Sequence, residues 1–244
     1  GGGNGPVDHL HEIRPQLVPP APPVSWTTQA WADVAPLRAA VDACSFVDGL
    51  RTGELDESVF AWYLRQDALY LSEYARVLAR ASALAPRSDE QVFWAEAAAT
   101  AVAVESELHR ARVGADAAAP APATLAYTDH LHAATARGSY GEVVAALLPC
   151  FWLYADLGER FVLASHAGHP YRDWLSTYAD PAFAASNRSA VEIAERAASE
   201  ASASERERMS VAFARSMRHE LAFFEAPVVA ASAATWPKEA MRGA

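Results

Sequence analysis

Apolar residues recur every three or four positions along most of this chain from Ser25 onward. That spacing places them on one face of an α-helix, whereas a half-buried strand alternates apolar and polar residues. No stretch longer than a few residues shows such alternation. Asp56 has the side chain of a helix N-cap, and Pro86 cannot continue a helix, so caps and breaks separate the periodic segments. The pattern therefore predicts an all-α fold.

The periodicity, together with the caps and breaks, gives the expected bounds of each helix. These helices are 27–47, 56–85, 88–114, 124–136, 140–165, 171–178, one that begins at 181, and 203–224, with a loop rich in Ala and Pro at 115–123. No linker or repeat divides the chain, so one helical bundle domain is expected over residues 25–226. Residues 1–24 are interpreted as a disordered or tag-derived extension and 227–244 as a tail.

Composition narrows the classes of protein that this chain can be. Of its 244 residues 52% are hydrophobic, which is enough for one sizeable core. The net charge of -10, without a basic cluster, argues against nucleic acid and anionic membranes as partners. The longest uncharged apolar run, 143–155, is well short of the ~20 residues that cross a bilayer. Without a signal peptide in view, we expect a cytoplasmic protein whose two cysteines, Cys44 and Cys150, are thiols.

Three of the predicted helices carry polar or reactive side chains on surfaces that are otherwise aromatic and aliphatic. Asp67 and Tyr70 share a face because they are three residues apart, and Cys150 and Tyr154 share one because they are four apart. Glu220 precedes an apolar, aromatic run. Each feature alone also fits a structural role, since a lone cysteine on an apolar helix more often packs than reacts. The three features together indicate a function more specifically than any one of them does.

Six stretches occur in order between residues 26 and 224: Tyr63-x-x-Gln66-Asp67-x-x-Tyr70-Leu71, Glu105-x-x-Leu108-His109, Tyr127-Thr128-x-His130, Ala146-Leu147-Leu148-Pro149-Cys150-x-Trp152-x-Tyr154, His169-Pro170-Tyr171-x-x-Trp174-x-x-Tyr178 and Glu220-x-x-Phe223. Together they resemble the TenA/thiaminase II family. The Leu-Leu-Pro-Cys segment resembles the branch of that family that has an active-site cysteine. Only the two termini fall outside the resemblance.

The resemblance implies a fold like that of haem oxygenase, with a pocket inside the bundle, and a homotetramer without cofactor or bound metal. It implies that Cys150 is the nucleophile, Glu220 the catalytic acid/base and Asp67 the carboxylate that holds a pyrimidine. The aromatic lining implied by the family pattern is Tyr70, Tyr127, Tyr154, Tyr178 and Phe223. The small-molecule partner is then an aminopyrimidine or thiamin.

The family's reaction replaces a group on the methylene at C5 of 4-amino-2-methylpyrimidine by hydroxyl. The substrate is 4-amino-5-aminomethyl-2-methylpyrimidine, which releases ammonia, or thiamin, or both. A thiolate that adds to ring carbon C6 pushes electrons toward C5 and expels the leaving group, and water then traps the exocyclic alkene. A buried carboxylic acid can protonate ring nitrogen N1, because burial raises its pKa.

Two other readings remain open from the sequence. A di-iron oxidase on the same bundle could use Glu105 and His109, which are four residues apart, but it would need further carboxylate and histidine ligands on facing helices. A non-catalytic pyrimidine-binding or regulatory protein would not need both Cys150 and Glu220. Turnover of the aminomethyl-pyrimidine, measured as ammonia release, separates these readings.

Overall fold

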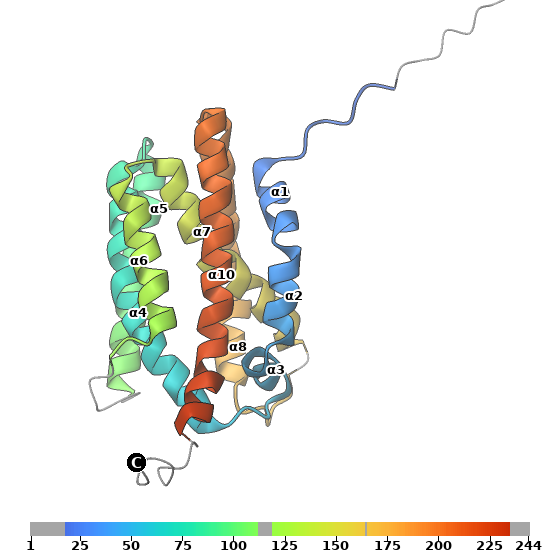
Figure 1. The fold of residues 1–244 in the computed structure, drawn as a ribbon, viewed down its shortest axis with the longest axis vertical. Helices are drawn as coiled ribbons and strands as arrows, with labels where there is room; N and C mark the ends of the chain where they lie inside the picture. The colour runs from blue at the N-terminus through green and yellow to red at the C-terminus, as the bar shows by residue number, and fades with distance from the viewer. Residues whose placement is uncertain (1–17, 112–118, 164, 235–244) are drawn as a thin grey trace, which may run out of the picture.

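The computed structural model describes residues 18–111, 119–163 and 165–234, which form ten α-helices and no β-strand (Figure 1). In chain order the helices are α1 (Trp26–Asp33), α2 (Ala35–Ala43), α3 (Ser45–Thr52), α4 (Glu57–Leu84), α5 (Ser88–Arg110), α6 (Pro122–Ala136), α7 (Tyr140–Val162), α8 (Arg172–Ala179), α9 (Pro181–Glu200) and α10 (Ala203–Ala234). The all-α prediction is confirmed for this part of the chain. Residues 1–17 of the expected extension, 115–118 of the expected loop and 235–244 of the expected tail lie outside the described residues, and the last two residues of that loop already belong to α6.

The helix predicted over 27–47 is wrong in its extent, because the structure divides it into α1, α2 and α3. Pro36 lies in the first turn of α2, where its missing N–H does no harm, although it could not continue α1. Cys44 has extended backbone and begins α3. This change of direction buries Phe46 and Leu50 in the core. Such packing against distant helices cannot be predicted from the local periodicity.

Helix α7 is the central element of the bundle and packs against α10, α9, α8, α6 and α4. Figure 1 shows α10 along the front of the molecule, with α4 and α6 on one side of it and α1 and α2 on the other. Among the described helices α7 alone is long and apolar enough to cross a membrane by length and composition, yet 78% of its apolar stretch is buried inside the bundle. The apolar sequence of α7 is therefore explained by its burial in the core of the bundle.

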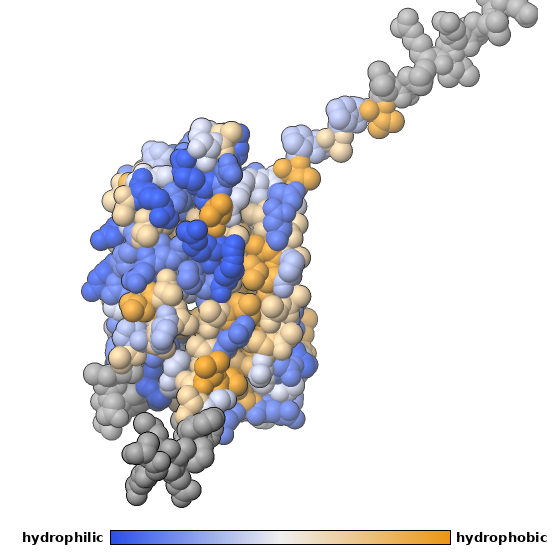
Figure 2. Space-filling model, in the orientation of Figure 1, coloured by the Kyte–Doolittle hydropathy of each residue, from blue (hydrophilic) through white to orange (hydrophobic). Residues whose placement is uncertain are grey.

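The N-terminal helices are attached to the bundle through Trp26. Its indole N–H donates to Ser210 Oγ at 3.0 Å, and its ring meets that of Phe213 edge-on at 6.1 Å. Its backbone N–H donates to a carboxylate oxygen of Glu195 at 3.2 Å. In Figure 2 the surface is more apolar where α1 and α2 meet α10 than over α6, where polar residues gather. These contacts join α1 to α9 and α10.

Helix α10 is longer than predicted, since it continues past residue 224 and through Pro227. The proline removes one backbone hydrogen bond, which usually ends a helix. Here Pro227 is buried, and it lines a small groove together with Val59 and Trp62 of α4. Val228 packs against the core as well. Packing against α4 therefore supports a helical turn that the amphipathic pattern does not predict.

Gly158 allows a close approach between α7 and α8. A Cβ atom at this position would stand 2.6 Å from the backbone carbonyl carbon of Tyr178, near the end of α8. Real Cβ atoms do not come that close to backbone, which cannot rotate away as a side chain can. The absence of a side chain at Gly158 therefore positions Tyr178, one of the predicted site residues.

Replacement of Gly158 by Ala is expected to lower the free energy of unfolding by about 1–3 kcal/mol, the usual cost of overpacking. Urea unfolding measures this loss. Gly168→Ala is the control, because a Cβ there would find its nearest neighbour, His166 Nδ1, at an ordinary contact distance of 3.6 Å. Equal stability of the two variants would contradict the close approach of α7 and α8.

Candidate active site

A cavity of about 280 Å³ lies between α4, α5, α7 and the start of α9. Four predicted site residues line it: Asp67, Cys150, Tyr154 and Tyr178. Much of the remaining wall is aliphatic or aromatic, including Leu71, Leu78, Phe93, Phe151 and Phe183. Apolar surroundings disfavour charge, and burial raises the pKa of both Asp67 and Cys150 in this wall.

Helix α4 brings Asp67, Tyr70 and Tyr74 to one face, because their spacings of three and four residues match the helical repeat. The helix begins where the Asp56 side chain accepts the N–H of Ser58 at 2.8 Å. All three of the aligned side chains are buried. The register of α4 thus decides which polar groups enter the apolar interior.

Asp67 is a buried carboxyl group without a hydrogen-bond donor among the described residues. Its side chain is only 7% exposed, and burial raises its pKa to about 7. Its carboxyl group lines the cavity. Such a group is divided between its acid and its carboxylate near neutral pH, so it can pair with a ligand that offers a donor beside an acceptor.

Cys150 lies on α7, one turn before Tyr154 on the same face. Burial is the main reason why the pKa of its thiol is raised well above the usual range, and the carboxylates of Glu220 and Asp67 raise it further. The hydroxyl groups of Tyr70 and Tyr74 act in the opposite direction. Tyr70 Oη nevertheless makes no well-formed hydrogen bond in the described structure. The thiol is therefore protonated near neutral pH, and the Tyr70 hydroxyl beside it has a proton free to stabilise a thiolate, whereas Tyr74 gives its proton to the backbone of α7.

Glu220 lies on α10 and is almost fully buried. Its Oε1 accepts a hydrogen bond of 2.6 Å from the hydroxyl of Tyr127 on α6. Burial raises the pKa of Glu220 to about 8, with a further contribution from Asp67, while the hydrogen bond from Tyr127 lowers it. At neutral pH the side chain is therefore mostly a neutral carboxylic acid, able to give a proton.

The predicted aromatic residues form two groups of packed rings, which Tyr63 and Phe224 join into one cluster. Tyr70 packs against Tyr127 at 4.8 Å and Phe223 at 5.7 Å between ring centroids, and Tyr154 packs against Tyr178 at 5.0 Å. The cluster extends from α4 across α6, α7, α8 and α10. Five helices thus supply one aromatic surface, which fits the expected stacking of a flat ring.

The predicted residues are not all in the wall of the cavity. Asp67, Cys150, Tyr154 and Tyr178 line it, whereas the others lie in the adjoining packed layer: Tyr70, Tyr127, Glu220 and Phe223. The two sets still interact, because Glu220 and Tyr70 both influence the pKa of Cys150. The structure thus brings all eight predicted residues into one region.

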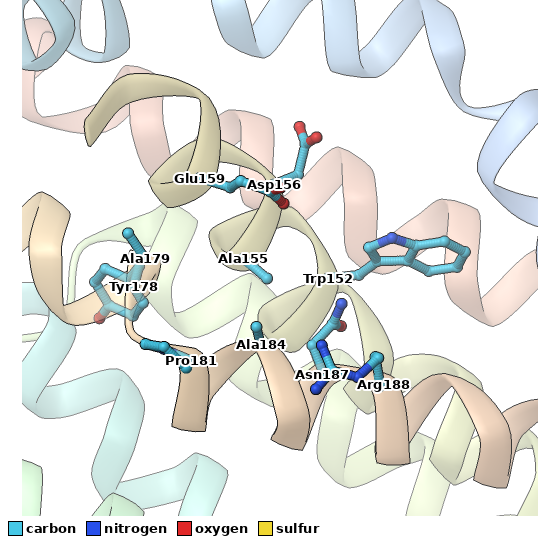
Figure 3. Close-up of a pocket in the computed structure, with 10 residues that line it drawn as sticks. All are labelled: Trp152, Ala155, Asp156, Glu159, Tyr178, Ala179, Pro181, Ala184, Asn187 and Arg188. Carbon is cyan, nitrogen blue, oxygen red and sulfur yellow. The ribbon is translucent and has the colours of Figure 1, made fainter. Parts of the chain in front are cut away.

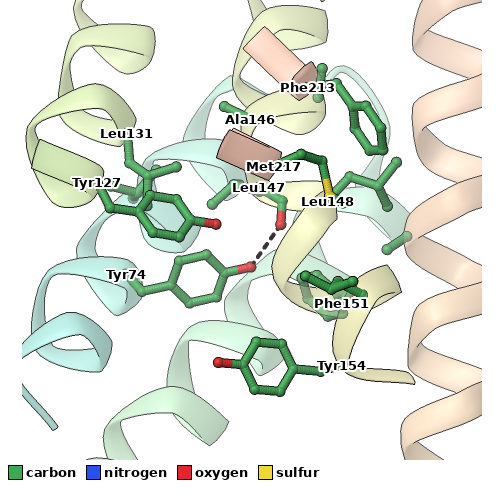
Figure 4. Packing of buried hydrophobic residues seen from close by; sticks show 14 of the residues in the cluster. Tyr74, Tyr127, Leu131, Ala146, Leu147, Leu148, Phe151, Tyr154, Phe213 and Met217 are labelled. Atoms are coloured by element: carbon green, nitrogen blue, oxygen red, sulfur yellow. Dashed lines mark hydrogen bonds between the residues drawn. The ribbon is translucent and has the colours of Figure 1, made fainter. Parts of the chain in front are cut away.

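Two residues of this region were missed as site residues by the sequence analysis. Tyr74 lines the cavity and donates its hydroxyl to the backbone carbonyl of Leu147 at 3.0 Å, as the dashed line in Figure 4 shows. The hydroxyls of Tyr63 and Tyr154 are 2.6 Å apart. Helical spacing could have identified both, because Tyr63 lies four residues before Asp67 and Tyr74 lies four after Tyr70. Only the contact of Tyr63 with α7 depends on tertiary structure.

Glu105 and His109, the pair considered for a di-iron site, lie on α5. Their side chains are 3.4 Å apart, and that of His109 is 64% exposed. Within the described residues no group of three or more His, Cys, Asp and Glu side chains could hold a metal ion. The pair is therefore an exposed contact on one helix, without facing ligands in the described chain.

A second pocket, of about 430 Å³, lies between α7 and α9 (Figure 3). Tyr178 is the residue that touches both this pocket and the smaller cavity. The other predicted site residues are absent from its wall, which includes Trp152, Asp156 and Arg188. The thiol and the buried carboxyl groups thus associate with the smaller cavity.

The family model described as TENA/THI-4/PQQC family matches residues 31–230. The thiamine biosynthesis multifunctional protein ThiED of Corynebacterium glutamicum is 37% identical over 260 aligned residues, which cover 92% of this chain and 34% of that protein. The aminopyrimidine aminohydrolase of Bacillus subtilis is 32% identical over 142 residues, covering 54% of this chain and 60% of that one. The chain thus matches about a third of the length of the first relative.

Solved structures agree with this assignment. The TenA homologue of P. horikoshii OT3 is 26% identical and superposes with a TM-score of 0.74, covering 84% of this chain and 98% of that one. A domain of unknown function with a haem oxygenase-like fold from Shewanella denitrificans OS217 is 13% identical, with a TM-score of 0.65 over 84% of this chain and 93% of that one. The haem oxygenase-like fold is therefore confirmed. Because the family model matches most of the length of this chain, the chain belongs to the TENA/THI-4/PQQC family.

Proposed function

We propose that this chain is an aminopyrimidine aminohydrolase that uses Cys150 as a nucleophile. The observation that carries the proposal is the meeting of three groups in one apolar region: the thiol of Cys150, the neutral acid Glu220 and the carboxyl of Asp67. The proposed reaction converts 4-amino-5-aminomethyl-2-methylpyrimidine and water to the 5-hydroxymethyl compound and ammonia. Thiamin is the second proposed substrate.

Asp67 has the properties needed to hold the pyrimidine. The 4-amino group donates and ring N3 accepts, so a neutral carboxylic acid can match both in one planar pair. Its pKa of about 7 leaves Asp67 partly ionised before the ligand arrives. The ionised fraction can take the proton of the Cys150 thiol, and the resulting acid then has the form that pairs with N3 and the amino group. Rings such as Tyr154 and Tyr178 supply stacking surfaces.

The covalent step begins when the Cys150 thiolate adds to ring carbon C6. Glu220 donates its proton to N1, so the ring accepts electrons without building up a negative charge. The C5 methylene then expels ammonia from its protonated amino group as an exocyclic alkene forms. Water adds to that alkene and gives its released proton to the departing ammonia, the thiolate leaves C6, and the proton on N1 returns to Glu220. No step requires a metal or an oxidant.

The size of the cavity favours the smaller substrate. Its volume of about 280 Å³ is just below the range of roughly 300–1,000 Å³ that is usual for small-molecule pockets. A single ring with short substituents suits such a space better than thiamin with its thiazolium. The predicted site residues all address the pyrimidine half, which the two substrates share.

We also propose a homo-oligomer, as the sequence predicts. Helix α5 packs mainly against α4, and its side chains Val92 and Val102 are 54% and 50% exposed. Contact with another copy of the chain would cover these side chains. A non-catalytic pyrimidine-binding protein is the alternative, and a chain that binds the pyrimidine without releasing ammonia would support it.

The nucleophile is tested by Cys150→Ala. Ammonia release from the aminomethyl-pyrimidine should fall on the order of 10³-fold or more. The helical circular dichroism and the melting temperature should stay nearly unchanged, because the side chain faces a cavity and contributes little packing. Cys44→Ala is the matched control and should remain active. Substantial turnover by the Cys150 variant would remove the covalent mechanism.

The leaving group is tested by comparing two substrates. The aminomethyl-pyrimidine should have a higher kcat/KM than thiamin, because contacts made equally with both substrates cannot favour thiamin and the cavity has little room for the thiazolium. Steady-state assays of ammonia and of free thiazole measure the ranking. If thiamin were better by tenfold or more, which is ~1.4 kcal/mol in the barrier, a true thiaminase would replace the proposed aminohydrolase.

The burial of Glu220 predicts a dependence of stability on pH. Its pKa of about 8 lies above the ~4.3 of an unfolded Glu. Between these values the folded state retains a proton that the unfolded state has lost, so stability falls as the pH rises from about 4 to about 8. Glu220→Gln cannot ionise. The free energy of unfolding of this variant minus that of the wild type should therefore increase by at least about 1 kcal/mol as the pH rises through this window.

Denaturant unfolding at about pH 5 and about pH 8.5 measures the change. Glu207→Gln, on the exposed side of the same helix, is the control and should show no such trend. A difference between Glu220→Gln and wild type that is the same at both pH values would show that Glu220 does not titrate as a buried acid.

A further inference from the structure

Two side-chain hydroxyls reach the backbone of α7 in the turn that precedes Cys150. Tyr74 donates to the carbonyl of Leu147 at 3.0 Å, and Ser216 donates to the carbonyl of Ala146 at 2.7 Å. In a regular helix the carbonyl of Ala146 also accepts the N–H of Cys150. Pro149, within the same turn, has no N–H to give. Figure 4 shows Ala146 and Leu147 in the packed interior, close to Tyr74 and Met217.

Ser216 is fully buried and has a second partner, His130 of α6. The distance from His130 Nε2 to Ser216 Oγ is 3.0 Å. Because Ser216 gives its only proton to the Ala146 carbonyl, His130 must be the donor in this contact. Burial lowers the pKa of His130 to about 4, so the ring is neutral near pH 7. Donation to Ser216 then requires the tautomer with its proton on Nε2. The hydroxyl of Ser216 is thereby held in one orientation.

The hydrogen bond from Ser216 to the Ala146 carbonyl lies at equivalent positions on α7 and α10 relative to the two reacting groups. Ala146 lies four residues before Cys150 on α7, and Ser216 lies four residues before Glu220 on α10. The bond thus joins the two helices one turn away from each of the two reacting groups. His130 also packs against His219, whose ring stacks on Tyr127 at 5.4 Å, and Tyr127 donates to Glu220.

We infer that Ser216, oriented by His130, is a positioning residue that sets the register between α7 and α10 and so places the Cys150 thiol opposite the Glu220 carboxyl. This inference rests on the proposed function, in which these two groups act on the same ring. Ser216 does not line the cavity, so it acts through the backbone of α7 and the register of α10. Loss of the Ser216 hydroxyl should change the placement of the Cys150 thiol relative to the Glu220 carboxyl more than it weakens binding of the pyrimidine.

The test uses Ser216→Ala in the full chain, with Cys44→Ala as the background so that Cys150 is the remaining thiol. The kcat for the aminomethyl-pyrimidine should fall about 10- to 100-fold, as misplaced reacting groups do, while KM stays within about twofold. Ser82→Ala is the matched control. It removes a hydroxyl-to-carbonyl bond of 2.7 Å between α4 and Gln91 of α5, and kcat should be unchanged.

A second readout does not depend on turnover. The pH dependence of Cys150 alkylation by iodoacetamide reports the pKa of the thiol. Glu220 raises that pKa, so a changed register between α7 and α10 in Ser216→Ala should shift it. In a Glu220→Gln background the same substitution should have no such effect, which gives a double-mutant cycle.

The outcomes separate the two hypotheses. Turnover by Cys150→Ala would overturn the proposed function, whereas the alkylation cycle would still test the positioning role. A kcat of Ser216→Ala within about twofold of its parent, an unchanged alkylation profile, or an equal loss in Ser82→Ala would overturn the positioning role. If Ser216→Ala does not fold, His130→Leu removes the donor that orients Ser216, and it should lower kcat in the same direction. A wild-type kcat in that variant would likewise overturn the inference.

Discussion

The burial of three ionisable groups in one apolar bundle is the constraint on which the rest of the site depends. Cys150, Asp67 and Glu220 each have a raised pKa, and in each case the loss of solvation is the largest cause. Their mutual repulsion adds to the effect when they ionise. A site with these properties favours neutral forms, so Glu220 keeps a proton that it can donate, while the thiol must be activated from its surroundings.

Tyrosine hydroxyls supply the hydrogen bonds in and around this buried region. Tyr127 donates to Glu220, Tyr74 donates to the backbone of α7, and the hydroxyls of Tyr63 and Tyr154 bond each other. A neutral hydroxyl satisfies a buried polar atom without adding a charge of its own. The aromatic rings that carry these hydroxyls also form the apolar wall. One residue type thus provides both the low dielectric and the hydrogen bonds that it makes necessary.

Helix α7 shows how the core and the site are combined in one element. Most of its residues are buried, which anchors it among α4, α6, α8, α9 and α10. In the interior of the helix, side chains of α4 and α10 donate to the backbone carbonyls of Leu147 and Ala146, in the turn that precedes Cys150. Gly158 admits Tyr178 at close range farther along the helix. The packing that stabilises the fold is therefore the same packing that orients the proposed nucleophile.

Much of the fold and the candidate site could be predicted from the sequence, because helical periodicity is local. The period of 3.6 residues indicated an all-α chain and aligned Asp67 with Tyr70 and Cys150 with Tyr154. The resemblance of six ordered stretches selected the remaining site residues. The division of the first helix at Cys44 and the continuation of α10 through Pro227 were not predicted, since both depend on packing with distant helices.

From Asp56 onward the sequence by itself determined which segments are helical, and it determined which of their faces hold reactive side chains. Only the tertiary structure decided which faces meet. Tyr127 and Glu220 are far apart in the chain, as are Ser216 and Ala146, and their hydrogen bonds exist because α6, α7 and α10 pack side by side. The pKa shifts follow from the same packing, because desolvation is a property of the assembled interior and not of any single helix.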